Sequence, residues 1–214
     1  MSTDPTADVT ALACGSAALM FEVATLEDVL ALYAALVDDR PAGVVDLVPA
    51  ARTLMLHLDP AVTDPATVER AVRGVSPRYG DERAGDLVEI PVVYDGEDLD
   101  EVGELTGWGA AGVVERHTAD EWTVAFCGFA PGFGYLASRS GEWDTARRST
   151  PRTKVPRGSV ALAGEFAGVY PQESPGGWQL IGRTDLPVFD LDRDPPALLT
   201  PGTRVRFVDV GRPE

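Results

Sequence analysis

Basic residues are scarce in this chain of 214 residues: 18 Lys and Arg stand against 34 Asp and Glu, a formal net charge of −16. Proteins that bind nucleic acid usually present a basic surface to the phosphates, so this balance argues against that class. The chain also lacks any run of roughly 20 apolar residues, and we expect no transmembrane helix. At 44% hydrophobic residues it still has enough apolar side chains for a core, unlike a disordered acidic tail.

Cysteine and histidine are rarer still, with two residues of each. Cys14 and Cys127 lie far apart and form no CxxC pair, so we expect neither a disulfide framework nor a metal site. His57 and His117 leave few ways to build a Ser-His-Asp triad, and we interpret both as structural. No glycine-rich phosphate loop of the P-loop type is present. The polar N-terminus lacks the features of a secretory signal, and we therefore expect a cytoplasmic protein.

Charge divides the chain into two parts. Residues 1–120 hold 23 of the acids and 7 cations, whereas residues 121–214 hold 11 of each, which suggests two folding units. In the first part, residues 1–14 are predicted to be a loose tail and residues 15–94 a ferredoxin-like domain with the order β-α-β-β-α-β. Its strands are predicted at Ala17–Val23, Val44–Val48, Thr53–Leu58 and Leu87–Val93, and its helices at Thr25–Asp38 and Pro65–Arg73.

The second part changes from helical to strand patterns. Residues 95–120 are predicted to form a helical connector, with helices at Leu99–Leu105 and Ala110–His117. From residue 121 onward, short apolar runs separated by Gly and Pro predict a β-barrel over residues 121–214. The fold class is therefore α+β. The barrel strands are expected at Trp122–Phe126, Ser159–Ala163, Ala167–Tyr170, Trp178–Arg183 and Thr203–Val208.

The candidate site lies within residues 127–182, where Gly and Pro alternate with aromatic and cationic residues. Proline fixes the backbone of such loops before a ligand binds, and glycine lets the backbone approach the ligand closely, so these loops are suited to a binding site. Between residues 145 and 164 the chain has no acid but five cations, namely Arg147, Arg148, Arg152, Lys154 and Arg157. Two interpretations stay open: the cations bind an anionic ligand, or they pair with acids of the first part or of a partner subunit. The aromatic residues of these loops likewise either line a binding site or belong to the hydrophobic core.

Three motifs in this region resemble one family. Gly128–Leu136, Thr150–Gly164 and Tyr170–Thr184 are similar nearly throughout to the family of the 5-oxoprolinase B subunit, also called allophanate hydrolase subunit 1 or the sporulation-kinase inhibitor family. The segment 189–207 and, more weakly, the region from about residue 15 also resemble it. Ala130, Gly134, Arg157 and residues 165–167 differ from the residues usual in the family.

The resemblance implies a small α/β domain followed by a cyclophilin-like β-barrel. It implies a sister subunit of related barrel fold, of the type of the 5-oxoprolinase C subunit or allophanate hydrolase subunit 2, and in 5-oxoprolinase a third subunit. Together such subunits open the lactam of 5-oxoproline to glutamate with ATP, which the complex would bind with Mg²⁺. Two other functions stay open: inhibition of a histidine kinase, and a carboxyltransferase component of a urea or allophanate pathway. This chain has no biotin-attachment segment.

The resemblance and the charge pattern together place a small anionic substrate near the three motifs. We expect anion contacts from Arg152, Lys154 and Arg157, because cations neutralise carboxylate and phosphate charge. No residue is assigned as catalytic base. One wall of the site is predicted to comprise Pro131, Gly132, Phe133 and Tyr135, and the opposite wall Ser174, Pro175, Gly176, Gly177 and Trp178.

Overall fold

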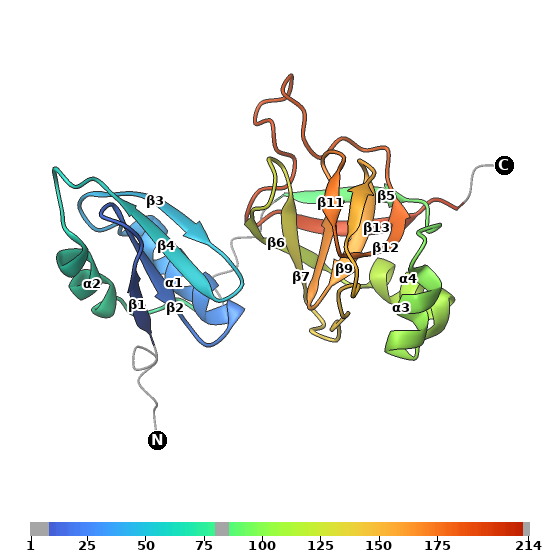
Figure 1. Ribbon diagram of the computed structural model, residues 1–214, viewed down its shortest axis with the longest axis horizontal. Coiled ribbons are helices and arrows are strands. Elements are labelled where there is room, and N and C mark those ends of the chain that lie inside the picture. The colour runs from blue at the N-terminus through green and yellow to red at the C-terminus, as the bar shows by residue number, and fades with distance from the viewer. Residues whose placement is uncertain (1–8, 80–85, 212–214) are drawn as a thin grey trace. The chain divides into compact units, whose positions relative to one another are not determined.

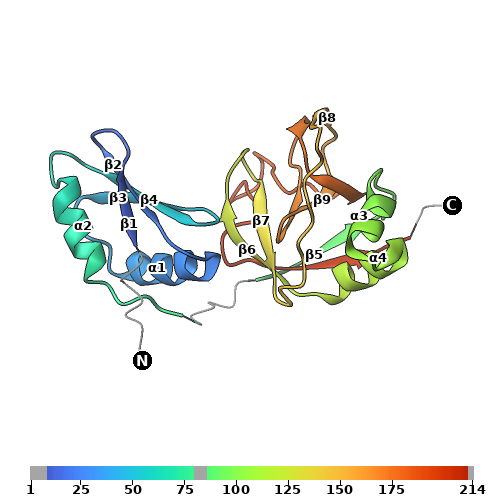
Figure 2. The same cartoon turned by 60° about the horizontal axis from the view of Figure 1, so that its bottom comes forward.

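The protein, represented by a computed structural model, is described over residues 9–79 and 86–211 (Figures 1 and 2). It divides into two compact units, Met1–Arg83 and Ala84–Glu214, each with its own hydrophobic core. We call them the N-terminal unit and the barrel unit. Both mix helices with sheets, which confirms the α+β class. In these described ranges no helix is both long and apolar enough to cross a membrane.

The N-terminal unit is a four-stranded antiparallel sheet, in the order β1-β2-β4-β3, with both helices on one face (Figure 2). Alternate residues of the sheet, such as Leu54 and Leu56 on β4, are buried against Leu36 and Val68 of the two helices. This period of two is the expected pattern for a sheet with one covered face. The elements are β1 (Thr10–Ala13), β2 (Ala18–Glu22), α1 (Leu26–Asp38), β3 (Val44–Pro49), β4 (Thr53–Leu58) and α2 (Pro65–Arg73).

Both helices begin after a capping residue, Thr25 for α1 and Asp64 for α2. The Thr25 hydroxyl accepts the N–H of Asp28, and the Asp28 carboxylate accepts the N–H of Thr25, which completes a capping box. The hydrogen bond from the Thr25 hydroxyl is the main reason that the pKa of Asp28 is lowered. Asp64 accepts the N–H groups of Ala66 and Thr67 at the start of α2.

The first five elements of the predicted order β-α-β-β-α-β are found as β2, α1, β3, β4 and α2, but the last strand was predicted wrongly. The edge position expected for Leu87–Val93 is occupied by β1, which pairs antiparallel with β2. Residues 10–13 are thus a strand and not part of a loose tail, while residues 1–8 lie outside the described ranges. Three of the four β1 residues are exposed, so the segment has no apolar alternation from which a strand could be recognised.

The barrel unit is a seven-stranded sheet in the order β12-β9-β10-β7-β6-β13-β5. Its two edge strands meet through a bridge between Val93 and Arg183, in which each backbone N–H donates to the other residue's carbonyl at 2.9 Å. The sheet is therefore a nearly closed barrel, as the cyclophilin-like expectation required. The strands are β5 (Leu87–Val92), β6 (Trp122–Cys127), β7 (Gly134–Ser138), β9 (Ser159–Ala163), β10 (Phe166–Val169), β12 (Gln179–Arg183) and β13 (Arg204–Asp209), and β8 (Arg152–Val155) and β11 (Ser174–Gly176) form a separate ribbon.

The predicted domain boundaries at residues 94 and 121 are therefore wrong. Strand β5 pairs in parallel with β13 and belongs to the barrel. The helices α3 (Leu99–Thr106) and α4 (Gly109–Ala119), predicted as a connector, pack beside β12 and β13 within the same unit (Figure 1). They belong there because Val102 and Val113 are completely buried in the barrel core. The barrel unit begins near residue 84.

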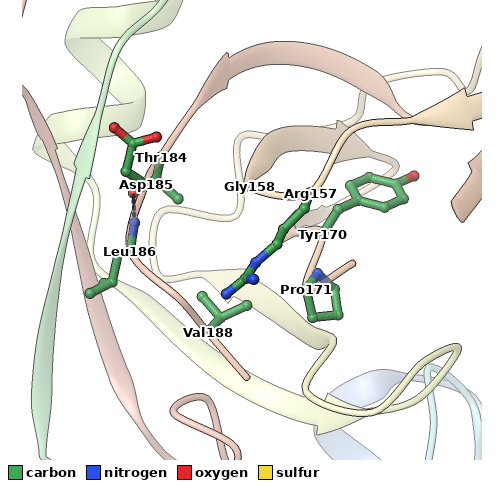
Figure 3. A pocket seen from close by; sticks show the side chains of 8 residues that line it. All are labelled: Arg157, Gly158, Tyr170, Pro171, Thr184, Asp185, Leu186 and Val188. Carbon is green, nitrogen blue, oxygen red and sulfur yellow. Dashed lines mark hydrogen bonds between the residues drawn. The ribbon is translucent and has the colours of Figure 1, made fainter. Parts of the chain in front are cut away.

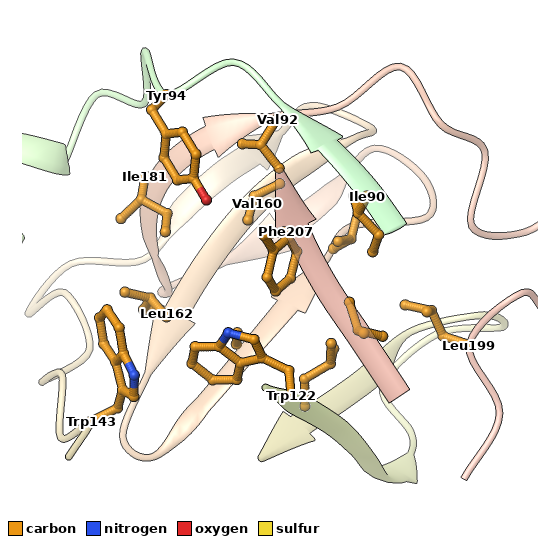
Figure 4. Close-up of a cluster of buried hydrophobic side chains, with 14 of the residues drawn as sticks. Ile90, Val92, Tyr94, Trp122, Trp143, Val160, Leu162, Ile181, Leu199 and Phe207 are labelled. Atoms are coloured by element: carbon orange, nitrogen blue, oxygen red, sulfur yellow. The ribbon is translucent and has the colours of Figure 1, made fainter. Parts of the chain in front are cut away.

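Aromatic rings, among them Trp122, Trp143 and Phe207, fill part of the barrel core (Figure 4). His117 of α4 is fully buried there, with ring centroids 4.2 Å from Phe207 and 5.0 Å from Trp122. Its Nδ1 lies 2.7 Å from the Tyr94 hydroxyl oxygen. Burial lowers the pKa of His117 to about 3, so the imidazole is neutral at physiological pH. This confirms the structural interpretation of His117.

Candidate functional site

The predicted aromatic residues of the three motifs meet in one cluster on the barrel. Phe133 lies at its centre, with ring centroids 5.1 Å from Tyr135, 5.3 Å from Tyr170 and 5.3 Å from Trp178. These edge-to-face contacts join the two predicted walls, whose nearest residues, Tyr135 and Ser174, are 39 positions apart in sequence. We name this set the aromatic cluster; it comprises Phe126, Phe129, Phe133, Tyr135, Phe166, Tyr170 and Trp178.

The second wall lies directly against this cluster. In the β8–β11 ribbon, Gly176 is the register partner of Arg152. A Cβ at Gly176 would overlap the Tyr170 hydroxyl, so only glycine allows this approach. The Gly177 carbonyl accepts the N–H of Arg148 at 2.9 Å. Ser174, which begins β11, has a buried hydroxyl with no hydrogen-bond partner among the described residues.

Phe129 differs from the rest of the cluster because its side chain is 59% exposed. Its backbone is in the left-handed region, with φ of 65°, which is unfavourable for a residue with a Cβ. Backbone hydrogen bonds hold the loop, among them Ala130 N–H to the Gly128 carbonyl at 2.7 Å and Phe133 N–H to the Ala130 carbonyl at 3.0 Å. An exposed ring held at a strained position is typical of a functional site.

The strain at Phe129 leads to a stability prediction for two variants that both delete the ring. We expect Phe129→Gly to have a free energy of unfolding about 1 kcal/mol higher than Phe129→Ala, because glycine adopts positive φ without strain. Denaturant titrations of the two variants, followed by tryptophan fluorescence, would measure this difference. At an ordinary position alanine is the more stable residue, so an alanine variant as stable as the glycine variant would contradict the prediction.

One of the five cations faces the aromatic cluster without an acidic partner. The Arg147 guanidinium carbon lies 5.9 Å from the centroid of the Trp178 ring. In residues 9–79 and 86–211, no carboxylate lies within 4.0 Å of its guanidinium nitrogens. Burial raises the pKa of the Tyr135 and Tyr170 hydroxyls, and the charge of Arg147 opposes that rise. Arg147 therefore supplies positive charge beside Tyr135, Tyr170 and Trp178.

Two other cations are engaged by Asp98, which the sequence did not single out. The Arg148 guanidinium lies 2.5 Å from one Asp98 oxygen, and Arg152 donates to both oxygens at 2.8 and 2.9 Å. Asp98 also accepts the N–H of Leu180 at 2.7 Å, and its side chain is only 3% exposed. Burial alone would raise the pKa of Asp98, but the hydrogen bonds from Arg152 and Leu180 lower it.

The open question about the cations is thus answered for two of them. Arg148 and Arg152 pair with an acid of the first part of the sequence, as the second interpretation required, and Arg152 also reaches Glu97 at 3.0 Å. Lys154 pairs with Glu173 at 2.8 Å, with both side chains more than half exposed. Arg152, Lys154 and Arg157 remain predictions as substrate contacts.

Arg157 lines a small pocket of about 140 Å³ that shares Tyr170 with the aromatic cluster (Figure 3). The remaining first-wall residues lie at the loop before β7: Pro131 is exposed, and Gly132 packs against the Phe189 side chain. Among the described residues, no group of three or more His, Cys, Asp or Glu could hold a metal ion. The other lining residues of the pocket are Gly158, Tyr170, Pro171, Thr184, Asp185, Leu186 and Val188.

Comparison with known proteins assigns this architecture to a family. Residues 9–199 match the family described as carboxyltransferase domain, subdomain C and D. The chain is 43% identical to the 5-oxoprolinase B subunit of Escherichia coli O157:H7 over 79% of each chain. It is 37% identical to the 5-oxoprolinase B subunit of Bacillus subtilis, over 83% of this chain and 80% of that one.

Solved structures show the same fold. The crystal structure of TTHA0988 superposes with a TM-score of 0.74 at 36% identity, covers 92% of this chain, and is matched over 41% of its own length. The Kluyveromyces lactis urea amidolyase superposes with a TM-score of 0.79 at 18% identity, over 98% of this chain and 15% of that chain, which shows the fold alone. The chain belongs to the carboxyltransferase subdomain C and D family, and within it to the group of 5-oxoprolinase B subunits.

Proposed function

We propose that this chain is a cytoplasmic subunit of an ATP-dependent 5-oxoprolinase, which opens the lactam of 5-oxoproline to give glutamate. The observation that carries the proposal is the 43% identity to a 5-oxoprolinase B subunit over most of both chains. The partners in this proposal are a sister barrel subunit, of the type of the 5-oxoprolinase C subunit, and a third subunit. We expect the chain to be inactive without them.

ATP and Mg²⁺ are assigned to the assembled complex rather than to this chain. The described residues include no three-residue cluster of metal ligands. The sequence contains no P-loop, and Asp98 already occupies the predicted anion contact Arg152 and its neighbour Arg148. These residues do not fit a nucleotide site.

The aromatic cluster with Arg147 is the part of this chain that we assign to the substrate. A guanidinium binds a carboxylate through two parallel hydrogen bonds, and Arg147 has no acid within 4.0 Å among the described residues. Trp178 and Tyr135 would exclude water from the lactam ring, which strengthens the ion pair. Lys154, on the adjacent β8–β11 ribbon, would be a second cation near the site, in an exposed ion pair with Glu173.

Reconstitution with the partner subunits tests this assignment. The complex should release glutamate from 5-oxoproline only when ATP is present. Arg147→Gln should lower kcat/KM about tenfold or more, since it removes a charged hydrogen bond to the substrate. Arg206→Gln, an equal loss of charge at an exposed position of β13, is the matched control and should leave the rate unchanged. A well-folded complex without activity would refute the function, and equal rates for both variants would refute the role of Arg147.

A carboxyltransferase component is a second candidate. It is favoured by the matched family description and by the shared fold with urea amidolyase. That activity would depend on a biotinylated carrier. Addition of such a carrier to the reconstituted complex separates the two candidates: activity that depends on the carrier indicates a carboxyltransferase component, and activity without it indicates a 5-oxoprolinase.

A further inference from the structure

The pocket at Arg157 has the features of a binding site and lies outside the set of Arg147, Tyr135 and Trp178 that we assign to the substrate. Its volume is about 140 Å³, enough for a small molecule but well below the roughly 300 Å³ or more of sites for larger ligands. Three apolar residues, Pro171, Leu186 and Val188, form part of its wall, and Arg157 and Thr184 provide polar groups (Figure 3).

The charge of Arg157 is not neutralised within the described part of the chain. No carboxylate there lies within 4.0 Å of its guanidinium nitrogens. Figure 3 shows the guanidinium directed toward Val188, whereas the carboxylate of Asp185 points away from it. The Thr184 hydroxyl accepts the N–H of Leu186 at 3.1 Å, so its own hydrogen is available to donate to a ligand.

The backbone around Arg157 is fixed before any ligand binds. The Gly158 N–H donates to the Tyr170 carbonyl at 2.8 Å, and the Gly158 carbonyl accepts the N–H of Thr184 at 2.8 Å. Gly158 has φ of +79°, and a Cβ there would overlap the Thr184 carbonyl oxygen. Arg157 and Thr184 are thus held on two tightly joined segments, which limits the entropy lost on binding.

We propose that this pocket binds a small monocarboxylate with a short uncharged body. The guanidinium of Arg157 would hold the carboxylate through paired hydrogen bonds, the Thr184 hydroxyl would add a third, and the apolar wall would cover the body. A single cation matches a single negative charge, and the nearby Asp185 disfavours a doubly charged phosphate. The site stands apart from the proposed function because it requires neither ATP nor any of the partner subunits.

The test uses the whole chain alone and three probes of similar size: butanoate, the neutral butanamide and inorganic phosphate. NMR of the Leu186 methyl groups should show saturable shifts with butanoate, and weaker or no saturation with the other two. Arg157→Gln should weaken butanoate binding about tenfold or more. Val188→Phe should weaken it similarly by filling the pocket while Arg157 stays in place.

Arg206→Gln is the control for loss of one surface charge and should bind butanoate as the wild type does. Equal binding of butanamide, tighter binding of phosphate, or unchanged binding by Arg157→Gln would each overturn the proposal. So would the absence of saturable shifts with butanoate. None of these results depends on 5-oxoprolinase activity, so failure here is distinguishable from failure of the proposed function.

Discussion

Asp98→Asn is expected to lower the free energy of unfolding of the barrel unit by about 3 kcal/mol. The substitution keeps the shape of the side chain but removes the charge that neutralises Arg148 and Arg152. Asp98 is almost completely buried, and loss of one partner from a buried ion pair leaves the other charge uncompensated. Asp98 also accepts the N–H of Leu180, which lies on β12, the edge strand that closes the barrel. The substitution should therefore destabilise the sheet as well as the ion pairs.

Denaturant titration followed by tryptophan fluorescence measures this effect in the barrel unit specifically. All four tryptophans, Trp108, Trp122, Trp143 and Trp178, belong to that unit, so the N-terminal unit does not contribute to the signal. Glu97→Gln is the matched control: Glu97 also pairs with Arg152, but its side chain is 78% exposed. Exposed pairs contribute at most about 1 kcal/mol. If both variants lose the same stability, Asp98 does not have the proposed role.

The second large effect concerns pH. Between pH 7 and pH 5 the barrel unit should lose about 2 kcal/mol of stability because of His117 alone. In the folded state the pKa of His117 is about 3, so the buried imidazole stays neutral over this range. In the unfolded chain it has its ordinary pKa of 6.5 and takes up a proton as the pH falls. The unfolded state therefore binds more protons, and stability decreases as pH decreases.

The window from pH 7 to pH 5 separates this histidine from the carboxylates. Asp98 and Asp120 have lowered pKa values in the folded state, and their contributions are lost only below about pH 5, where the unfolded carboxylates become protonated. His57 lies in the N-terminal unit, whose unfolding does not change the tryptophan fluorescence because all four tryptophans belong to the barrel unit. His117→Gln should reduce the difference between pH 7 and pH 5 to less than about 0.5 kcal/mol, because the titrating group is gone. A wild-type barrel equally stable at both pH values would contradict the burial argument.

Elements with local signals were predicted well from the sequence. The two helices predicted at Thr25–Asp38 and Pro65–Arg73 are confirmed as Leu26–Asp38 and Pro65–Arg73, because helical periodicity is visible within a few residues of sequence. The pairing of strands was not predictable in the same way. Ile90 and Val92 indicate a buried strand, but they do not indicate which of the two units it joins. The strand belongs to the barrel because it pairs in parallel with β13, which is more than 100 residues away in sequence.

For the candidate site, too, local features were predictable from the sequence and distant pairings were not. The aromatic residues were identified because Gly and Pro made their loops conspicuous, and the structure brings Phe133, Tyr135 and Trp178 together. Whether a cation is neutralised by an acid depends on Asp98, which lies 50 residues before Arg148. Asp98 has no distinguishing sequence feature apart from its place before a helix. A charge pattern therefore located the cations but could not distinguish Arg147, without an acidic partner among the described residues, from Arg148.

The bridge between Val93 and Arg183 has a consequence for the order of folding. It joins residues 90 positions apart, and β13, near the C-terminal end of the unit, must enter between β5 and β6. The sheet of the N-terminal unit instead contains hairpins such as β3–β4, which link neighbours in the chain. Structures rich in distant contacts form more slowly, because the chain ends must first meet. During synthesis the N-terminal unit can fold while β5 still lacks its partner, and the barrel closes only after residue 209 has emerged.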